Sequence, residues 1–135
     1  MMAALFPYAQ VTEGITVRVA PRYLPDQSDP DDDRYAWSYH VRIENGSMRD
    51  VQLISRHWII TDARGHVEEV EGPGVVGEQP LLSPGESFDY VSGCPLPTPS
   101  GTMHGTYAFA AEGEMLAVDI PAFSLDIPHE RGAVH

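Results

Sequence analysis

Apolar and polar residues alternate one by one along most of this chain, in segments separated by turn residues. Because successive side chains of a strand point to opposite faces, this period of two predicts half-buried β-strands. The predicted strands lie at residues 15–20, 37–44, 51–61, 67–71, 87–92, 103–111 and 115–127. Pro121 cannot donate to a strand ladder, so it predicts a β-bulge or an edge position in the last segment.

The joints between these segments contain residues that favour tight turns, including Asn45-Gly46, Ser83-Pro84-Gly85 and Asp62-Ala63-Arg64-Gly65. No long stretch has a helical period. The pattern predicts an all-β protein, an antiparallel immunoglobulin- or fibronectin-III-like β-sandwich of about seven to eight strands. We expect one domain over residues 1–135, with an ordered core at about 12–127 and flexible N- and C-terminal tails.

The chain carries a net charge of −12, and all eight of its basic residues are arginine. Nucleic-acid binding requires a basic face that neutralises phosphates, so the composition argues against it and against anionic membrane surfaces. No apolar run is long enough for a membrane span, and we expect no membrane insertion. A single cysteine, Cys94, excludes an intrachain disulfide and favours a reducing compartment. We therefore expect a cytoplasmic protein.

A glycine-rich segment, GPGVVG, follows the fourth predicted strand. Gly72, Gly74 and Gly77 match the G-x-G-x-x-G spacing of pyrophosphate-binding loops, in which a helix N-terminus holds the anion. Here Pro80 and Pro84 follow, so no helix is expected to begin. A glycine-rich turn could still bind an anion through its backbone N–H groups. The other interpretation is a loop whose glycines permit an unusual backbone path.

Arg56, His57 and Trp58 lie within the third predicted strand. Strict alternation places Arg56 and Trp58 on one face with Ile54 and Ile60, and His57 on the other face with Leu53 and Ile59. The structural interpretation puts Trp58 in the core, Arg56 at the rim paired with a carboxylate, and His57 in a half-buried hydrogen bond. The functional interpretation is a recognition patch, because arginine and tryptophan are frequent anchors of binding surfaces.

Metal-binding and catalytic patterns are weak. The six histidines show neither an H-x-H nor an H-x-x-x-H spacing; they are His40, His57, His66, His104, His129 and His135. Asp29, Asp31 and Asp33 have the spacing that begins a calcium loop, but Arg34 replaces its glycine and His40 its terminal glutamate. Cys94 is followed by proline and is expected to be inert. We expect no cofactor, no defined metal site and no catalytic residue.

Several long motifs, in order, resemble the ApaG family over residues 15–127. They are YAWSYHVRIEN, VQLISRHWIITDARG, GPGVVGEQPLLSPGESFDYVSG and GTMHGTY. The resemblance implies a fibronectin-III-like sandwich and a role in cobalt resistance and magnesium efflux. Similar domains in F-box proteins and in a polymerase-delta-interacting protein imply protein recognition. The phosphate-binding-like motif of the family falls on Gly72, Gly74 and Gly77.

These observations favour a non-enzymatic protein-interaction module whose surface includes Arg56, His57, Trp58 and the GPGVVG segment. Its partner would be an unidentified protein. The alternative is a nucleotide or pyrophosphate sensor that uses the same segment, which the family's frequent neighbourhood to a diadenosine polyphosphate hydrolase gene supports. The sequence does not determine the oligomeric state.

Overall fold

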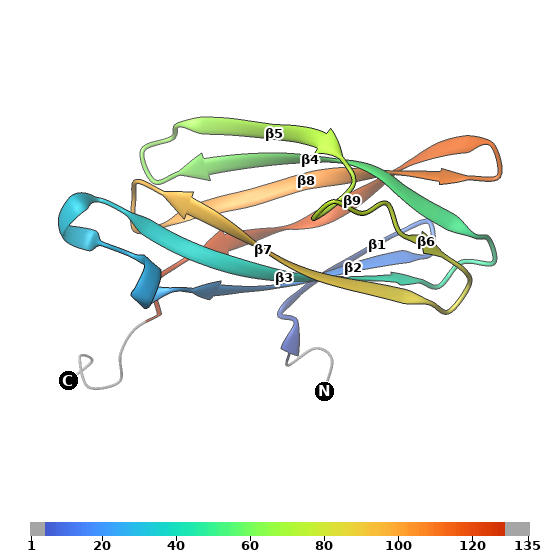
Figure 1. Ribbon diagram of the computed structural model, residues 1–135, viewed down its shortest axis with the longest axis horizontal. Coiled ribbons are helices and arrows are strands. Elements are labelled where there is room, and N and C mark those ends of the chain that lie inside the picture. The colour runs from blue at the N-terminus through green and yellow to red at the C-terminus, as the bar shows by residue number, and fades with distance from the viewer. Residues whose placement is uncertain (1–4, 129–135) are drawn as a thin grey trace.

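Two β-sheets packed face to face form the protein in the computed structural model, which describes residues 5–128 (Figure 1). The strands are β1 (Tyr8–Thr12), β2 (Ile15–Tyr23), β3 (Tyr35–Asn45), β4 (Val51–Asp62), β5 (Val67–Pro73), β6 (Leu81–Leu82), β7 (Ser87–Leu96), β8 (Gly101–Ala111) and β9 (Glu114–Leu125). One sheet has the order β1-β2-β3-β7 and the other the order β5-β4-β8-β9, with β6 paired to β4. The predicted all-β sandwich is confirmed, and every strand pair is antiparallel.

Two strands were not among the predicted segments. β1 pairs with β2 along its whole length, from Tyr8 opposite Val19 to Thr12 opposite Ile15. Paired backbone therefore begins before residue 12, where the ordered core was expected to start. β6 is only two residues long, too short for a period of two to be visible.

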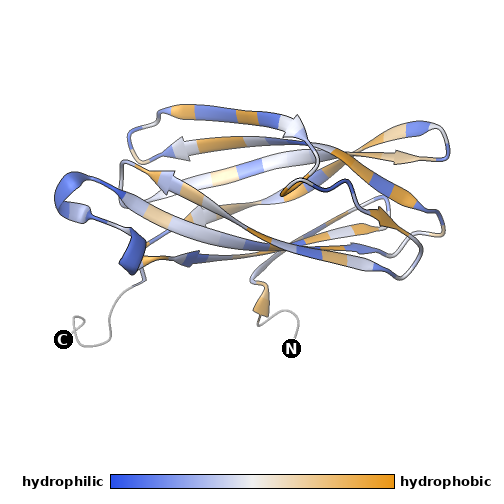
Figure 2. Cartoon of the chain, viewed as in Figure 1, coloured by the Kyte–Doolittle hydropathy of each residue, from blue (hydrophilic) through white to orange (hydrophobic). Residues whose placement is uncertain are grey.

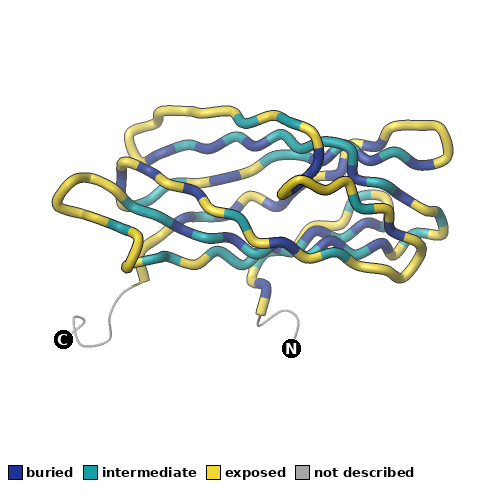
Figure 3. Tube along the Cα trace, viewed as in Figure 1, coloured by how far each residue is buried: buried dark blue, intermediate teal, exposed yellow. Residues whose placement is uncertain are grey.

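The core lies between the sheets, where the inward-facing side chains of both meet. Buried positions alternate with half-buried ones along β2 and β3 and mostly with exposed ones along β7 and β9, and hydropathy alternates as well (Figures 2 and 3). The largest side chains with almost no exposed surface include Trp37, Tyr107 and Phe109. The hydroxyls of Tyr90 on β7 and Tyr107 on β8 hydrogen-bond to each other and so connect the two sheets. This arrangement satisfies the polar ends of two buried rings inside the core.

A β-bulge in β9 confirms the prediction made from Pro121. Met103 pairs with Phe123 but Gly105 pairs with Ile120, so β9 contains one residue more than β8 there. β9 is also an edge strand of its sheet. At a bulge and on an edge strand some residues need not donate to the ladder, so Pro121, which has no backbone N–H, is tolerated there.

A second bulge, in β4, corrects the predicted faces of that strand. Leu53 pairs with Phe109 and Ser55 with Ala108, which leaves Ile54 as an extra residue. Leu53 is therefore fully buried on the same side as Trp58, whereas the prediction grouped it with His57 on the opposite face. The prediction was wrong because an extra residue shifts the alternation by one position.

The acidic segment between β2 and β3 forms two short 3₁₀ helices, Pro25–Gln27 and Pro30–Asp32. Arg34 lies 3.5 Å from a carboxylate oxygen of Asp29 and 3.3 Å from one of Asp32. Asp29 and Asp32 thus already pair with an arginine side chain of the same segment. Within residues 5–128, no helix has the length and apolar character needed to cross a bilayer. The predicted C-terminal tail lies mostly outside the described residues.

Candidate functional site

Two of the predicted site residues, Arg56 and Trp58, line a hollow between the edge strands β5 and β7, where the two sheets are not joined. Its volume is about 250 Å³. We call it the Arg56 hollow and define it by Tyr39, Arg56, Trp58, Glu68, Ser92 and Cys94. These residues come from β3, β4, β5 and β7, so the hollow exists only when both sheets are assembled.

Arg56 holds the start of the glycine loop, residues 72–77, against β4. Its Nη1 donates to the carbonyl oxygens of Pro73 at 3.1 Å and Gly74 at 3.0 Å. Gly72 lies opposite Arg56 in the β4–β5 pair, and a Cβ added at Gly72 would lie 3.2 Å from the same nitrogen. The guanidinium therefore passes close over Gly72 to reach the carbonyls. The predicted carboxylate partner is replaced by backbone: no carboxylate of residues 5–128 lies within 4.0 Å of Arg56.

Two polar groups of the hollow remain accessible. Nε and Nη2 of Arg56 and the indole N–H of Trp58 make no hydrogen bond within residues 5–128, although the Trp58 side chain is only 2% exposed. Every buried side-chain nitrogen or oxygen of this part of the chain has a partner. These donors are therefore accessible to solvent, and both residues line the hollow. An arginine and an indole offer only donors, so the hollow is suited to a carbonyl or carboxylate oxygen.

The glycine loop is closed by its own backbone. The N–H of Gly74 donates to the bulge carbonyl of Ile54 at 2.8 Å, and Val75 and Glu78 exchange two backbone hydrogen bonds. The side chain of Val75 is fully buried. Gly77 has φ +82° in the intervening turn, and a Cβ at Gly74, where φ is +63°, would lie 2.4 Å from the oxygen of Glu78. Glycine at position 74 thus permits a tight backbone path.

His57 lies on the other face of β4. Its Nε2 is 2.7 Å from a carboxylate oxygen of Glu69, and its side chain is 34% exposed. This is the half-buried hydrogen bond that the structural interpretation expected. His57 cannot share one contact surface with Arg56 and Trp58, because the sheet separates them.

Burial affects the ionisation of Cys94 and Tyr39 in the hollow. It raises the pKa of the Cys94 thiol from 9.0 to about 11, and the nearby Glu68 carboxylate adds to the effect. Burial also raises the pKa of Tyr39, against the lowering effects of Ser92 and, less strongly, of Arg56. Both groups are thus protonated at neutral pH. A protonated thiol is a weak nucleophile.

The structure shows no candidate metal centre in residues 5–128, where no three His, Cys, Asp or Glu side chains come together suitably. His40 lies 2.9 Å from Asp89 and packs edge-on against Phe6, with ring centroids 4.8 Å apart. His129 and His135 lie outside the described residues.

The structure thus brings together Arg56, Trp58, Gly72 and Gly74, and it separates His57 and Gly77 from them. Tyr39, Ser92 and Cys94 were not predicted to line the site, because their proximity to β4 depends on how the sheets pack. The carbonyl of Ile54 was not predicted either; it accepts from Gly74 at 2.8 Å and from the Gln79 side chain at 2.9 Å. This carbonyl is available because Ile54 is the extra residue of a bulge, and the pattern of apolar residues in β4 did not indicate that bulge.

This chain has relatives that match it over more than nine-tenths of its length. The ApaG domain family model matches residues 25–111, which include every residue that lines the Arg56 hollow. Protein ApaG of Rhodospirillum centenum is 60% identical over 125 residues, which cover 92% of this chain and 96% of that protein. Protein ApaG of Parvibaculum lavamentivorans is 59% identical over 129 residues, covering 95% and 99%.

Solved structures have the same fold. A crystal structure of a Bordetella pertussis protein described as ApaA has a TM-score of 0.83 and 56% identity, covering 86% of this chain and 95% of that one. The C-terminal domain of wzt has a TM-score of 0.55 at 12% identity, covering 91% and 78%. At that identity the likeness shows the fold alone.

Proposed function

Because this chain belongs to the ApaG family, we propose that it is a non-enzymatic protein-interaction module that binds its partner at the Arg56 hollow. The observation that carries this proposal is the pair of accessible donors on Arg56 and Trp58. They line an opening between two sheet edges, and no carboxylate oxygen of residues 5–128 lies within 4.0 Å of the guanidinium. A partner would supply the missing acceptor as a carboxylate or a backbone carbonyl.

The position of Trp58 changes the role proposed for it. With 2% of its side chain exposed, it forms the floor of the hollow and offers its N–H there. Arg56 forms the side and fixes the adjacent loop through Pro73 and Gly74. Deep, rigid donors of this kind are typical of binding hot spots, which lie in largely desolvated pockets. His57 lies on the opposite face of β4 and would not contact the partner at this hollow.

A catalytic role for the hollow has little chemical support. Cys94, the one thiol of the chain, is buried and has a raised pKa. The cobalt resistance and magnesium efflux implied by the family would then arise through the partner protein. In this proposal the chain contacts no metal.

The test is affinity capture from a cell lysate with the wild type, Arg56→Gln and Arg64→Gln. Arg64 is an exposed arginine in the β4–β5 turn and makes no ion pair within residues 5–128, so it is a matched control for the lost charge. We expect Arg64→Gln to capture the wild-type partner and folded Arg56→Gln to lose it. If Arg56→Gln captures the partner as well as the wild type does, the partner does not bind at the hollow.

The nucleotide alternative finds little support in the backbone of the glycine loop. The N–H groups of Gly74, Val75 and Glu78 already donate to backbone carbonyls, whereas an anion-binding loop directs such groups at its ligand. An amide-resolved NMR titration with a magnesium nucleotide tests it directly. Saturable shifts confined to residues 72–77, lost in Gly74→Val, would favour the nucleotide sensor over the protein module.

A further inference from the structure

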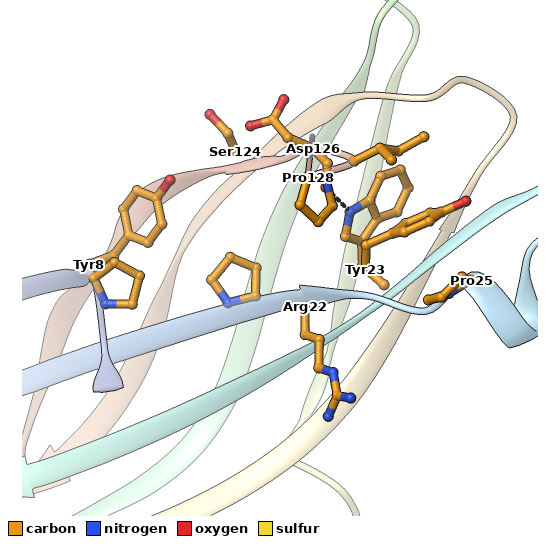
Figure 4. Close-up of a pocket in the computed structure, with 11 residues that line it drawn as sticks. Tyr8, Arg22, Tyr23, Pro25, Ser124, Asp126 and Pro128 are labelled. Atoms are coloured by element: carbon orange, nitrogen blue, oxygen red, sulfur yellow. Dashed lines mark hydrogen bonds between the residues drawn. The ribbon is translucent and has the colours of Figure 1, made fainter. Parts of the chain in front are cut away.

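The sandwich has a second, larger hollow, distinct from the one at Arg56. The start of β1, the end of β2 and the segment after β9 surround it, and its volume is about 750 Å³ (Figure 4). We call it the aromatic groove and define it by Tyr8, Pro21, Tyr23, Trp37 and Asp126. Most of this groove lies outside the residues that the family model matches.

The rings of the groove form a row along the strands. Tyr8 pairs with Val19, and Pro21 and Tyr23 follow at two-residue steps on the same face of β2. At about 3.3 Å per strand residue, the row from Tyr8 to Tyr23 is about 13 Å long. Four residues of a polyproline II helix, at about 3.1 Å each, span about the same length.

Buried aromatic rings support this row from below. The rings of Tyr23 and Trp37 have centroids 5.4 Å apart, at 59°, and those of Tyr8 and Phe123 are 5.9 Å apart. Trp37 forms the floor, and its indole N–H donates to the backbone oxygen of Asp126 at 2.9 Å. Both tyrosines are thus held by rings that are themselves buried. Rigid aromatic surfaces of this kind bind ligands at a low cost in conformational entropy.

The hydroxyls of Tyr8 and Tyr23 are available to a ligand. Neither makes a hydrogen bond within residues 5–128, and because every buried side-chain oxygen there has a partner, both hydroxyls reach solvent. A polyproline II segment has no internal hydrogen bonds, so its carbonyl oxygens need outside donors. Two donors on a row of rings match that requirement.

The charges near the groove favour a basic ligand. Asp126 lines it and is exposed, and Pro25, another lining residue, begins the acidic segment that contains Asp26 and Asp31. Arg22 also lines the groove, but its side chain extends to the side of β2 opposite Tyr23 (Figure 4). A second copy of this chain, also at net −12, would be repelled.

We propose that the aromatic groove binds a proline-rich, arginine-containing segment of a partner protein in the polyproline II conformation. Prolines pack on Tyr8, Pro21 and Tyr23, and a flanking arginine pairs with Asp126. This site is independent of the Arg56 hollow, so either proposal can fail without the other.

The test is an NMR titration of the full chain with a blocked synthetic peptide that carries two Pro-x-x-Pro repeats and flanking arginines. We expect saturable shifts at the backbone amides around Tyr8, Tyr23 and Asp126, and none at residues 72–77. Tyr23→Ala should weaken binding at least about tenfold. Tyr35→Ala, a half-buried tyrosine outside the groove, is the matched control and should leave binding unchanged.

Two control peptides determine the ligand chemistry. Replacing the prolines by alanine, or the arginines by glutamate, should each weaken binding at least about tenfold. Equal binding of the alanine peptide, or no shifts in the groove, would overturn the proposal. Shifts that depend on protein concentration without peptide would assign the groove to a second copy of the chain and overturn it as well.

Discussion

The two hollows of this sandwich each have a tryptophan as floor, but the two indole N–H groups differ in what they contact. In the aromatic groove the N–H of Trp37 donates to the backbone of Asp126, 89 residues away, and rings and prolines remain at the surface. In the Arg56 hollow the N–H of Trp58 stays free beside a guanidinium. Both openings have an indole at the floor, but only the one at Trp58 offers its N–H to a ligand, because the N–H of Trp37 already has an acceptor.

The hollows also differ in where their residues come from. The Arg56 hollow is built from residues within four strands of both sheets, and one of them, Arg56, also holds the glycine loop. The groove is built from strand ends and adjoining segments. Two surfaces with different chemistry on one domain would allow two different partners to bind.

The largest effect is expected from removing either floor. Trp58→Ala and Trp37→Ala should each lower the free energy of unfolding by about 3 to 5 kcal/mol, because each leaves a cavity under an opening. Urea denaturation at neutral pH measures it. A loss below about 1 kcal/mol for either variant would show that this tryptophan is not the floor of its hollow.

A glycine pair tests whether the loop that Arg56 holds is structurally fixed. Gly74→Ala should cost about 3 kcal/mol, because a Cβ would meet the oxygen of Glu78 at 2.4 Å in addition to the strain of φ +63°. Gly77→Ala has open space and should cost only about 1 kcal/mol for its positive φ. Thermal unfolding of both variants checks this order, which equal losses would contradict.

Replacement of each tryptophan by phenylalanine isolates the difference between the two donors. Trp37→Phe removes the hydrogen bond to Asp126 and should cost about 1 kcal/mol more than Trp58→Phe, whose donor has no partner to lose. Paired urea curves give this difference. If Trp58→Phe is the costlier variant, the N–H of Trp58 has a partner and the Arg56 hollow offers one donor fewer.

The alkaline stability of the protein should depend on the Arg56 hollow through Cys94. Its folded pKa of about 11 lies above its ordinary 9.0, so between these values the folded state keeps a proton that the unfolded state releases. Stability should therefore fall as the pH rises through this interval, by about 1 kcal/mol at pH 10 from this thiol. Cys94→Ala should show a smaller decline, and identical declines would contradict the assignment.

Much of the fold was predictable because its signals are local. The alternation in β2 and β3, the turn at Gly65 with φ +86° and the irregularity at Pro121 all arise from residues close together in sequence. The structural interpretation of Trp58 in the core and His57 in a half-buried hydrogen bond was also correct. The partner of Arg56 was not, because a guanidinium can be satisfied by carbonyls as well as by a carboxylate.

The all-β class and most of the strands followed from the sequence, because strand periodicity and turn preferences depend on neighbouring residues. The family followed from the order of several long motifs. The two hollows, in contrast, exist only in the folded sandwich. The bulge at Ile54 reversed the face of Leu53 and turned a carbonyl toward the glycine loop. The packing of distant strands then left the donor of Trp58 free and satisfied that of Trp37. Such contacts join residues far apart in the chain, and their geometry depends on how both sheets assemble.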